Sequence, residues 1–157
     1  DVDYDDIEVL IHPESVVHSM IECTDTAVIG QLGTPDMRLP IQYALTYPKR
    51  MHLDMKHLDF KELLTLEFMP PRVDDFPALN LAYEVGKIGG FKPAVFNAAN
   101  ETAVYAFLDG KIIFSDIYKI VTAVLESMGR EDDFTLDNLL AIDQWARIKA
   151  SEFINRR

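Results

Sequence analysis

Histidines and carboxylates near the N-terminus are the first residues whose types and spacing could do chemistry. His12 and Glu14 stand two residues apart, and His18 follows six residues after His12. Two imidazoles and a carboxylate can hold zinc, but Pro13 separates the first two and the spacing does not suit one helical face. A His-x-Glu pair also opens the zinc-deaminase signature, which needs two later cysteines, and this chain has only Cys23. We therefore expect no metal site built from this chain alone, and interpret His12 as an end-of-strand residue that bonds to backbone.

His18 lies in the middle of an expected strand, between Val17 and Ser19. It is either a sheet histidine that hydrogen-bonds to its surroundings or an imidazole that a partly buried site tunes to relay protons. The chain shows neither a nucleophile elbow nor a Cys–His pair. The sequence therefore predicts no hydrolytic triad and leaves both interpretations of His18 open.

A loop containing Gly33, Pro35 and Met37 offers another kind of contact. Proline fixes the path of such a loop and glycine permits a tight turn. A methionine presented there could pack on a flat ligand ring, or it could fill the core. Asp36 and Arg38 are expected to pair locally or to fix the loop.

Two further patterns come from the second half of the chain. Asn97 and Asn100 are three apart on one face of an expected helix, where they could anchor a neighbouring segment or contact a ligand. Gly86 and the Gly89-Gly90 pair end a helix and do not follow a strand, so they fail the context test for a phosphate-binding loop.

Alternating apolar residues predict the secondary structure of the first third. Strands are expected at 7–11, 16–21 and 27–32, with the last two antiparallel if the polar turn between them is a hairpin. One or two helical turns are expected at 41–46. Prolines and mixed polarity at 47–76 break any period and indicate a connector, with a short edge strand possible at 66–68.

From Pro77 the apolar period changes to that of a helix. Helices are expected at 77–88, at 93–108, from Ser115 as N-cap, and from Thr135, where Leu136 and Leu140 are among the residues expected to face inward. Four amphipathic helices with short loops predict a bundle. The fold class is therefore α+β, with a short antiparallel β piece (1–46), a connector (47–76) and a C-terminal four-helix bundle (77–157).

Composition narrows the classes of function. The 157 residues carry a net charge of −11 with 48% apolar residues, which favours a packed globular chain. The acidic balance argues against nucleic acid and anionic membrane surfaces as partners. One cysteine, the lack of an apolar run long enough to span a bilayer, and an acidic N-terminus indicate a cytoplasmic location. The missing initiator Met fits a chain cut from something longer.

A series of short motifs follows along nearly the whole chain. In order, they are Glu8-Val9-Leu10-Ile11-His12-Pro13, His18-Ser19, Gln31-Leu32-Gly33, Pro35-Asp36-Met37-Arg38, Leu58-Asp59-Phe60, Phe76-Pro77, Leu81-Ala82, Asn97-Ala98-Ala99-Asn100-Glu101 and Phe114-x-Asp116-Ile117. Together they resemble the 1-deoxy-D-xylulose 5-phosphate reductoisomerase family. The resemblance covers the later part of that enzyme, namely the end of the catalytic and dimerisation domain, the connector and the helical bundle.

The resemblance implies an enzyme that isomerises the phosphosugar 1-deoxy-D-xylulose 5-phosphate and reduces it with NADPH to 2-C-methyl-D-erythritol 4-phosphate. This reaction belongs to the non-mevalonate pathway of isoprenoid synthesis and uses Mg²⁺ or Mn²⁺. The resemblance also implies that NADPH and the metal are bound mainly by residues absent from this chain. Within the chain, it implies His18 as a catalytic residue in a supporting role, and Pro35 and Met37 as cofactor-binding residues near the nicotinamide ring.

Two further expectations, one about assembly and one about activity, follow from the same resemblance. The N-terminal strands are expected to form a homodimer contact, and the fragment alone is expected to be inactive. The alternative is a non-catalytic interaction or dimerisation module derived from that enzyme.

Overall fold

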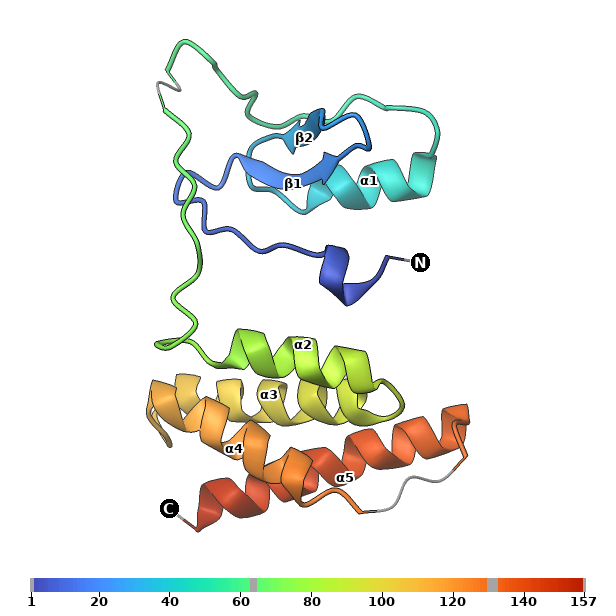
Figure 1. Ribbon diagram of the computed structural model, residues 1–157, viewed down its shortest axis with the longest axis vertical. Helices are drawn as coiled ribbons and strands as arrows, with labels where there is room; N and C mark the ends of the chain where they lie inside the picture. Colours follow the sequence, from blue (N-terminus) through green and yellow to red (C-terminus); the bar gives the residue numbers. More distant parts are fainter. Residues whose placement is uncertain (1, 63–64, 130–132, 157) are drawn as a thin grey trace. The chain divides into compact units, whose positions relative to one another are not determined.

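The computed structural model describes residues 2–62, 65–129 and 133–156, and the chain forms two compact units (Figure 1). One unit is Glu8–Pro71. The other combines Asp1–Ile7 with Arg72–Arg157. None of the described helices has the length and apolarity that crossing a membrane would require.

The unit Glu8–Pro71 contains an antiparallel hairpin of β1 (Val17–Glu22) and β2 (Val28–Leu32). The residues between the strands close a tight turn, in which the Cys23 amide donates to the Ala27 carbonyl at 2.8 Å. The turn residue Thr26 has a φ of 69°, a left-handed conformation that is uncommon for a residue other than glycine. The predicted antiparallel pair is confirmed.

Helix α1 (Arg38–Thr46) follows the hairpin. It begins three residues before the expected helical turns, because Pro40 lies in the first turn, where its missing N–H needs no partner. This places the start of α1 directly after Pro35 and Met37.

The prediction of a strand at 7–11 is wrong. Among the described residues of that stretch, only Ile11 forms a bridge, with Met69, and Ile7 and Leu10 are exposed. Alternation shows that a segment can be a strand, but a ladder also needs a partner of matching length. The connector supplies only one paired residue, one position beyond the edge strand considered at 66–68.

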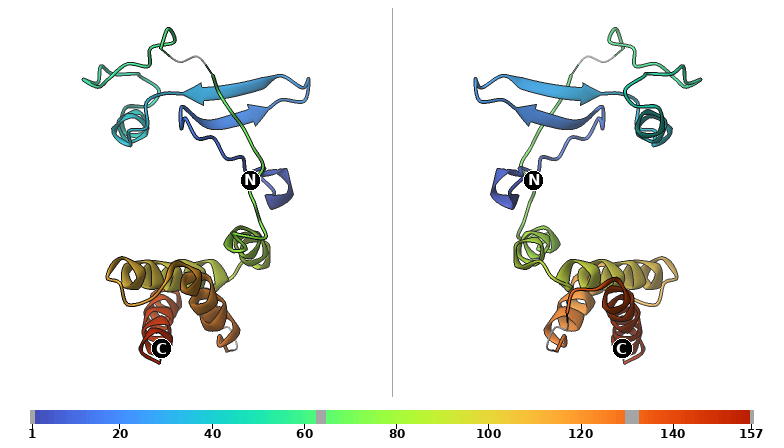
Figure 2. Two further views of the ribbon diagram at one scale, coloured as in Figure 1. Left: turned by 90° about the vertical axis from the view of Figure 1, so that its left-hand side faces the viewer. Right: turned by 90° about the vertical axis from the view of Figure 1, so that its right-hand side faces the viewer.

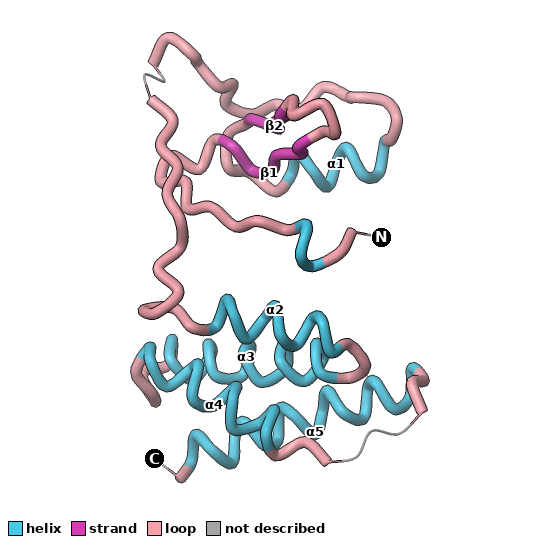
Figure 3. Tube along the Cα trace, viewed as in Figure 1, coloured by secondary structure: helices cyan, strands magenta, loops and turns pink. Residues whose placement is uncertain are grey.

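In its described residues, the second unit has a short 3₁₀ turn, η1 (Tyr4–Asp6), and four helices. They are α2 (Ala78–Ile88), α3 (Lys92–Leu108), α4 (Phe114–Glu126) and α5 (Leu136–Asn155). Figure 3 shows how helix dominates this part of the chain. The four predicted helices are confirmed.

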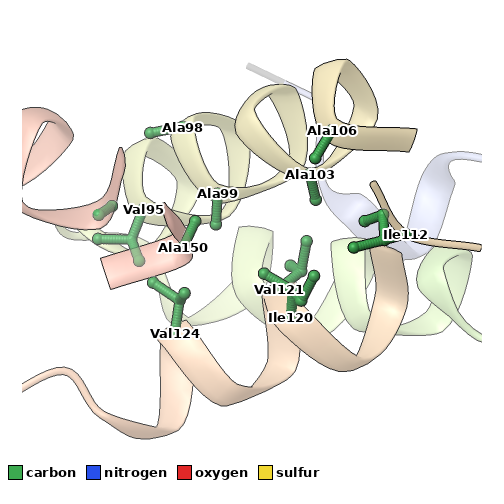
Figure 4. Packing of buried hydrophobic residues seen from close by; sticks show 11 residues of the cluster. Val95, Ala98, Ala99, Ala103, Ala106, Ile112, Ile120, Val121, Val124 and Ala150 are labelled. Carbon is green, nitrogen blue, oxygen red and sulfur yellow. The ribbon is translucent and has the colours of Figure 1, made fainter. Parts of the chain in front are cut away.

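Helix α3 is the centre of this unit, with α2 on one side and α4 and α5 on the other (Figures 1 and 2). Its buried residues are Val95, Ala98, Ala99, Ala103 and Ala106. Alanine lets neighbouring helix backbones approach closely, and Ile120, Val121 and Val124 of α4 fill the space (Figure 4). A helix packed on several sides is apolar around much of its circumference.

Two details of the helix ends differ from the predictions. Ile113, not Ser115, is the N-cap of α4, and no side chain caps this helix. Thr135 caps α5 as predicted, accepting from the Asn138 amide at 3.2 Å. Leu136 and Leu140 are exposed instead of facing inward, because α5 enters the core only further along, where Ala146 is fully buried.

Candidate functional site

His18 lies at an irregularity in the hairpin. The register is Val17 opposite Leu32 and then Ser19 opposite Gln31, so His18 is the extra residue of a β-bulge. Bulges aim a side chain differently from the regular pleat and are frequent beside active sites. His18 is exposed rather than partly buried.

The carbonyl of Val16 connects His18 to the loop after β2. It lies 3.0 Å from Nδ1 of His18 and also accepts the amide of Gly33 at 3.0 Å. Val16 itself is buried. Because a carbonyl only accepts, the geometry assigns the proton to Nδ1, and the neutral ring then carries its lone pair on Nε2. One buried backbone atom therefore orients the ring and fixes the start of the loop.

The loop is held at its other end by Asp36 and Arg38. The Asp36 carboxylate accepts the Arg38 amide at 2.9 Å and the guanidinium Nε at 3.0 Å. The Arg38 guanidinium, followed by the Arg38 amide, lowers the pKa of Asp36 to about 2. The expected local pairing is confirmed, and it fixes the residues on either side of Met37.

Pro35 and Met37 are both exposed, and Met37 is 71% exposed. The interpretation of Met37 as a core residue is therefore wrong, because no described residue buries it. An exposed thioether on a fixed loop can pack against a flat ring.

The connector builds a pocket of about 350 Å³ beside this loop. Arg50, His52, Lys56 and His57 bring cationic or titratable groups to its lining, and the loop contributes Gly33 and Thr34. The Thr34 hydroxyl donates to the Lys56 carbonyl at 3.2 Å, and the Arg50 guanidinium lies 4.2 Å from the centre of the Tyr43 ring. Sequence reasoning missed this pocket, although clustered basic residues in a chain of net charge −11 are a signal that could have found it.

His12 belongs to a different cluster. Its Nδ1 lies 2.8 Å from the Glu67 carbonyl and 3.0 Å from Glu14, and its ring stacks on Phe68 at 4.6 Å. The Glu14 carboxylate also accepts the Glu67 amide at 3.2 Å, and its hydrogen bonds with backbone, aided by His12, lower the pKa of Glu14. His12 bonds to backbone as expected, but it does not end a strand, because Ile11 forms only a single bridge there.

The structure brings His18 and the loop of Pro35 and Met37 to the same end of the hairpin, and it places His12 with Glu14. Over residues 2–62, 65–129 and 133–156, no group of three or more His, Cys, Asp or Glu side chains could hold a metal ion.

The Asn97–Glu101 motif lies on α3 in the other unit. Asn97 is exposed, Asn100 lines a pocket of about 430 Å³ beside Phe76 and Phe114, and Glu101 pairs with Arg147 of α5 at 2.7 Å. The motif therefore contributes at least one contact that joins two helices.

Comparison with known proteins places these features in a family. Residues 32–149 match the model of the DXP reductoisomerase C-terminal domain. The 1-deoxy-D-xylulose 5-phosphate reductoisomerase of Desulforamulus reducens is 50% identical over 153 residues, covering 98% of this chain and 40% of that protein. The enzyme of the same name from Heliobacterium modesticaldum is 50% identical over 97% of this chain and 39% of its own length.

Solved structures agree with the sequence relatives. The reductoisomerase of Zymomonas mobilis in complex with NADPH has a TM-score of 0.85 at 48% identity, over 94% of this chain and 39% of that chain. A DOX-P reductoisomerase in complex with NADPH, fosmidomycin and magnesium has a TM-score of 0.84 at 38% identity, over 93% of this chain and 38% of its own. The chain thus spans about two fifths of its relatives' length. It belongs to the 1-deoxy-D-xylulose 5-phosphate reductoisomerase family, of which it matches the C-terminal part.

Proposed function

We propose that this chain is the C-terminal part of an enzyme that isomerises 1-deoxy-D-xylulose 5-phosphate and reduces it with NADPH to 2-C-methyl-D-erythritol 4-phosphate. The identity of 50% across 98% of the chain carries the proposal. Such an enzyme acts in the non-mevalonate pathway of isoprenoid synthesis. The single free cysteine, Cys23, supports a reducing, cytoplasmic location.

Met37 and Pro35 form the proposed contact to the nicotinamide ring of NADPH. Both are exposed on a loop that hydrogen bonds fix at Gly33 and at Arg38, so the backbone that carries the thioether is already in place. When bound, NADPH supplies the hydride. The residues of this chain would orient the ring and shield one of its faces from water.

His18 has the proposed supporting role. With Nδ1 donating to the Val16 carbonyl, the neutral ring presents Nε2 as an acceptor that can position a hydroxyl or a neighbouring donor. As the family resemblance implies, residues outside this chain are proposed to hold the Mg²⁺ or Mn²⁺ ion.

The domain boundaries proposed are 1–46 for the end of the catalytic and dimerisation domain, 47–76 for the connector and 77–157 for the bundle. The division between Pro71 and Arg72 supports a change of unit close to residue 77, and Asp1–Ile7 groups with the helices. A homodimer through the hairpin is part of the proposal, supported by the exposed apolar side chains of Ile21 and Ile29. These side chains would equally serve the alternative, a dimerisation module without chemistry.

The direct test is turnover of 1-deoxy-D-xylulose 5-phosphate with NADPH and Mg²⁺ or Mn²⁺. A protein that joins this chain to the preceding part of a relative should oxidise NADPH, and the 157-residue chain alone should not. If the joined protein folds and binds NADPH but gives no product, the non-catalytic module is favoured instead.

Met37→Ala tests the cofactor contact in the same joined protein. We expect KM for NADPH to rise roughly twofold to tenfold, because a contact between sulfur and an aromatic ring is worth about 0.3–1.5 kcal/mol. Met69→Ala is the matched control, since Met69 is also exposed and its hydrogen bonds with Ile11 join backbone atoms. An unchanged KM in Met37→Ala would remove this residue from the cofactor site.

A further inference from the structure

The N-terminal residues 4–7, which we call the strap, lie on one face of α2. Tyr83 donates from its hydroxyl to the Ile7 carbonyl at 2.8 Å, and Lys87 pairs with Asp5. The turn is closed locally by Asp3, whose carboxylate accepts the Asp5 amide at 3.1 Å. A hydrogen bond and an ion pair thus hold the strap at two successive turns of the helix.

Gly86 lies between these two attachments and receives the ring of Tyr4. A Cβ built on Gly86 would overlap the Tyr4 ring carbons and its hydroxyl, well inside van der Waals contact. Glycine inside a helix costs about 0.5–1 kcal/mol relative to alanine, so its presence there calls for a packing reason. The ring provides that reason. The sequence suggested that Gly86 helps to end the helix, but the structure shows that it makes room for the ring of Tyr4.

Helix α2 is weakly held by the rest of its unit. Val85 is its only buried residue within the described structure, whereas α3, α4 and α5 bury five, four and two residues respectively. Among the other helices, α2 packs chiefly on α3. A helix with so few buried side chains depends more than its neighbours on contacts from outside the bundle.

Both covalent connections to the unit Glu8–Pro71 also lead to α2. Ile7, the residue before that unit, is bonded to Tyr83, and Arg72, the residue after it, stands six positions before the first residue of α2. Opening of α2 would therefore loosen both places where the chain enters or leaves the helical unit.

We propose that the strap and α2 form one opening unit, which releases and closes together while α3, α4 and α5 stay folded, with Tyr4 seated on Gly86 as the latch. Proteins open locally in such cooperative pieces, and the pieces that move are those with the fewest buried contacts. The contact of Tyr4 with Gly86 would thus control the local opening of α2, independently of the chemistry proposed above.

Hydrogen exchange on the 157-residue chain tests this latch. Tyr4→Ala should speed exchange at the strap and at α2 together by roughly fivefold to thirtyfold, with exchange in α4 and α5 unchanged. Tyr105→Ala, in which an exposed tyrosine of α3 is removed, is the matched control. Equal acceleration in all helices would overturn the proposal, because it would show only global unfolding.

Gly86→Ala gives the sharper result, because whether it speeds or slows hydrogen exchange in α2 depends on the presence of the Tyr4 ring. With Tyr4 present, the added methyl should displace the strap and speed exchange in α2. In the Tyr4→Ala background, the same change should slow exchange in α2 roughly twofold to fivefold, because alanine favours helix. Slower exchange in both backgrounds would mean that no ring occupies the seat. Gly129→Ala, where a Cβ would meet nothing within 4 Å, is the control.

A more conservative substitution tests the proposal in case the variants above fail to fold. Tyr83→Phe removes only the hydroxyl that bonds to Ile7, and it should speed exchange at the strap and at α2 roughly twofold to tenfold. Acceleration confined to the strap, with α2 unaffected, would show that the two do not open as one unit.

Discussion

At the residue scale, Asp36 is the clearest electrostatic feature of the candidate site. Arg38 lowers the pKa of Asp36 to about 2, below its ordinary value of 3.8. A lowered pKa stabilises the folded loop above pH 4, and this contribution is lost as the pH falls through about 2. The carboxyl carbon shift of Asp36 should therefore titrate near pH 2 by NMR.

Arg38→Gln should move that titration midpoint upward, toward 3.8, because the charged hydrogen bonds disappear. Arg72→Gln is the control, since Arg72 pairs with Asp75 in the other unit. An unchanged Asp36 midpoint in Arg38→Gln would mean that another group holds the carboxylate.

His18 allows its two nitrogens to be separated by substitution. In His18→Asn the side-chain amide can still donate to the Val16 carbonyl, as Nδ1 does now, but no group replaces Nε2. If Nε2 positions substrate or a metal-site carboxylate, kcat of the joined enzyme should fall roughly tenfold to a hundredfold in both His18→Asn and His18→Ala. Activity retained in His18→Asn and lost in His18→Ala would assign His18 a purely structural role.

At the element scale, the stability of the bundle rests on the side chains between α3 and α4. Ile120 is 1% exposed and Ile148 of α5 is 53% exposed. Ile120→Val should lower the free energy of unfolding by about 0.5–1.5 kcal/mol, whereas Ile148→Val should stay within about 0.5 kcal/mol of zero. Urea denaturation followed by circular dichroism measures both, and equal effects would contradict this packing.

The helices were predictable from sequence, because apolar residues at a 3.6-residue period need only one neighbouring surface. Thr135 was predictable because a cap bonds to its own helix, whereas the cap expected at Ser115 was not found, because α4 already begins at Phe114. The strand at 7–11 was not, since pairing depends on a distant connector that offers only Met69. Leu136 and Leu140 carry the right period, but the point where α5 meets α3 is set by tertiary packing.

The candidate site was predictable only in part. Pro35 and Met37 stood out by residue type, and local chemistry predicted the pairing of Asp36. The shared carbonyl of Val16 could not be foreseen, because it depends on the hairpin register and on the bulge at His18. The pocket at Arg50 and Lys56 depends on how the connector folds back, which no local period encodes.

At the scale of the whole molecule, the hairpin presents exposed apolar side chains that a partner could cover. An isolated pair of strands is marginal in water, and Ile21 is 68% exposed. If the hairpin forms the homodimer, light scattering should report twice 17.9 kDa for the chain and the monomer mass for Ile21→Glu. Ile113→Glu, at 65% exposure in the other unit, should leave the dimer intact, and a monomeric parent chain would refute the contact.

The carbonyl that serves two donors has a practical consequence. When a ligand or a neighbouring side chain bonds to the imidazole of His18, the bond of the ring to the Val16 carbonyl changes in strength, and the Gly33 amide shares the same oxygen. The nitrogen resonance of Gly33 is therefore expected to report contacts made at the His18 ring, and it can be read in an isotope-labelled sample without altering the ring itself. Binding of any molecule to the imidazole should therefore shift the amide resonance of a glycine that lies fifteen positions further along the chain.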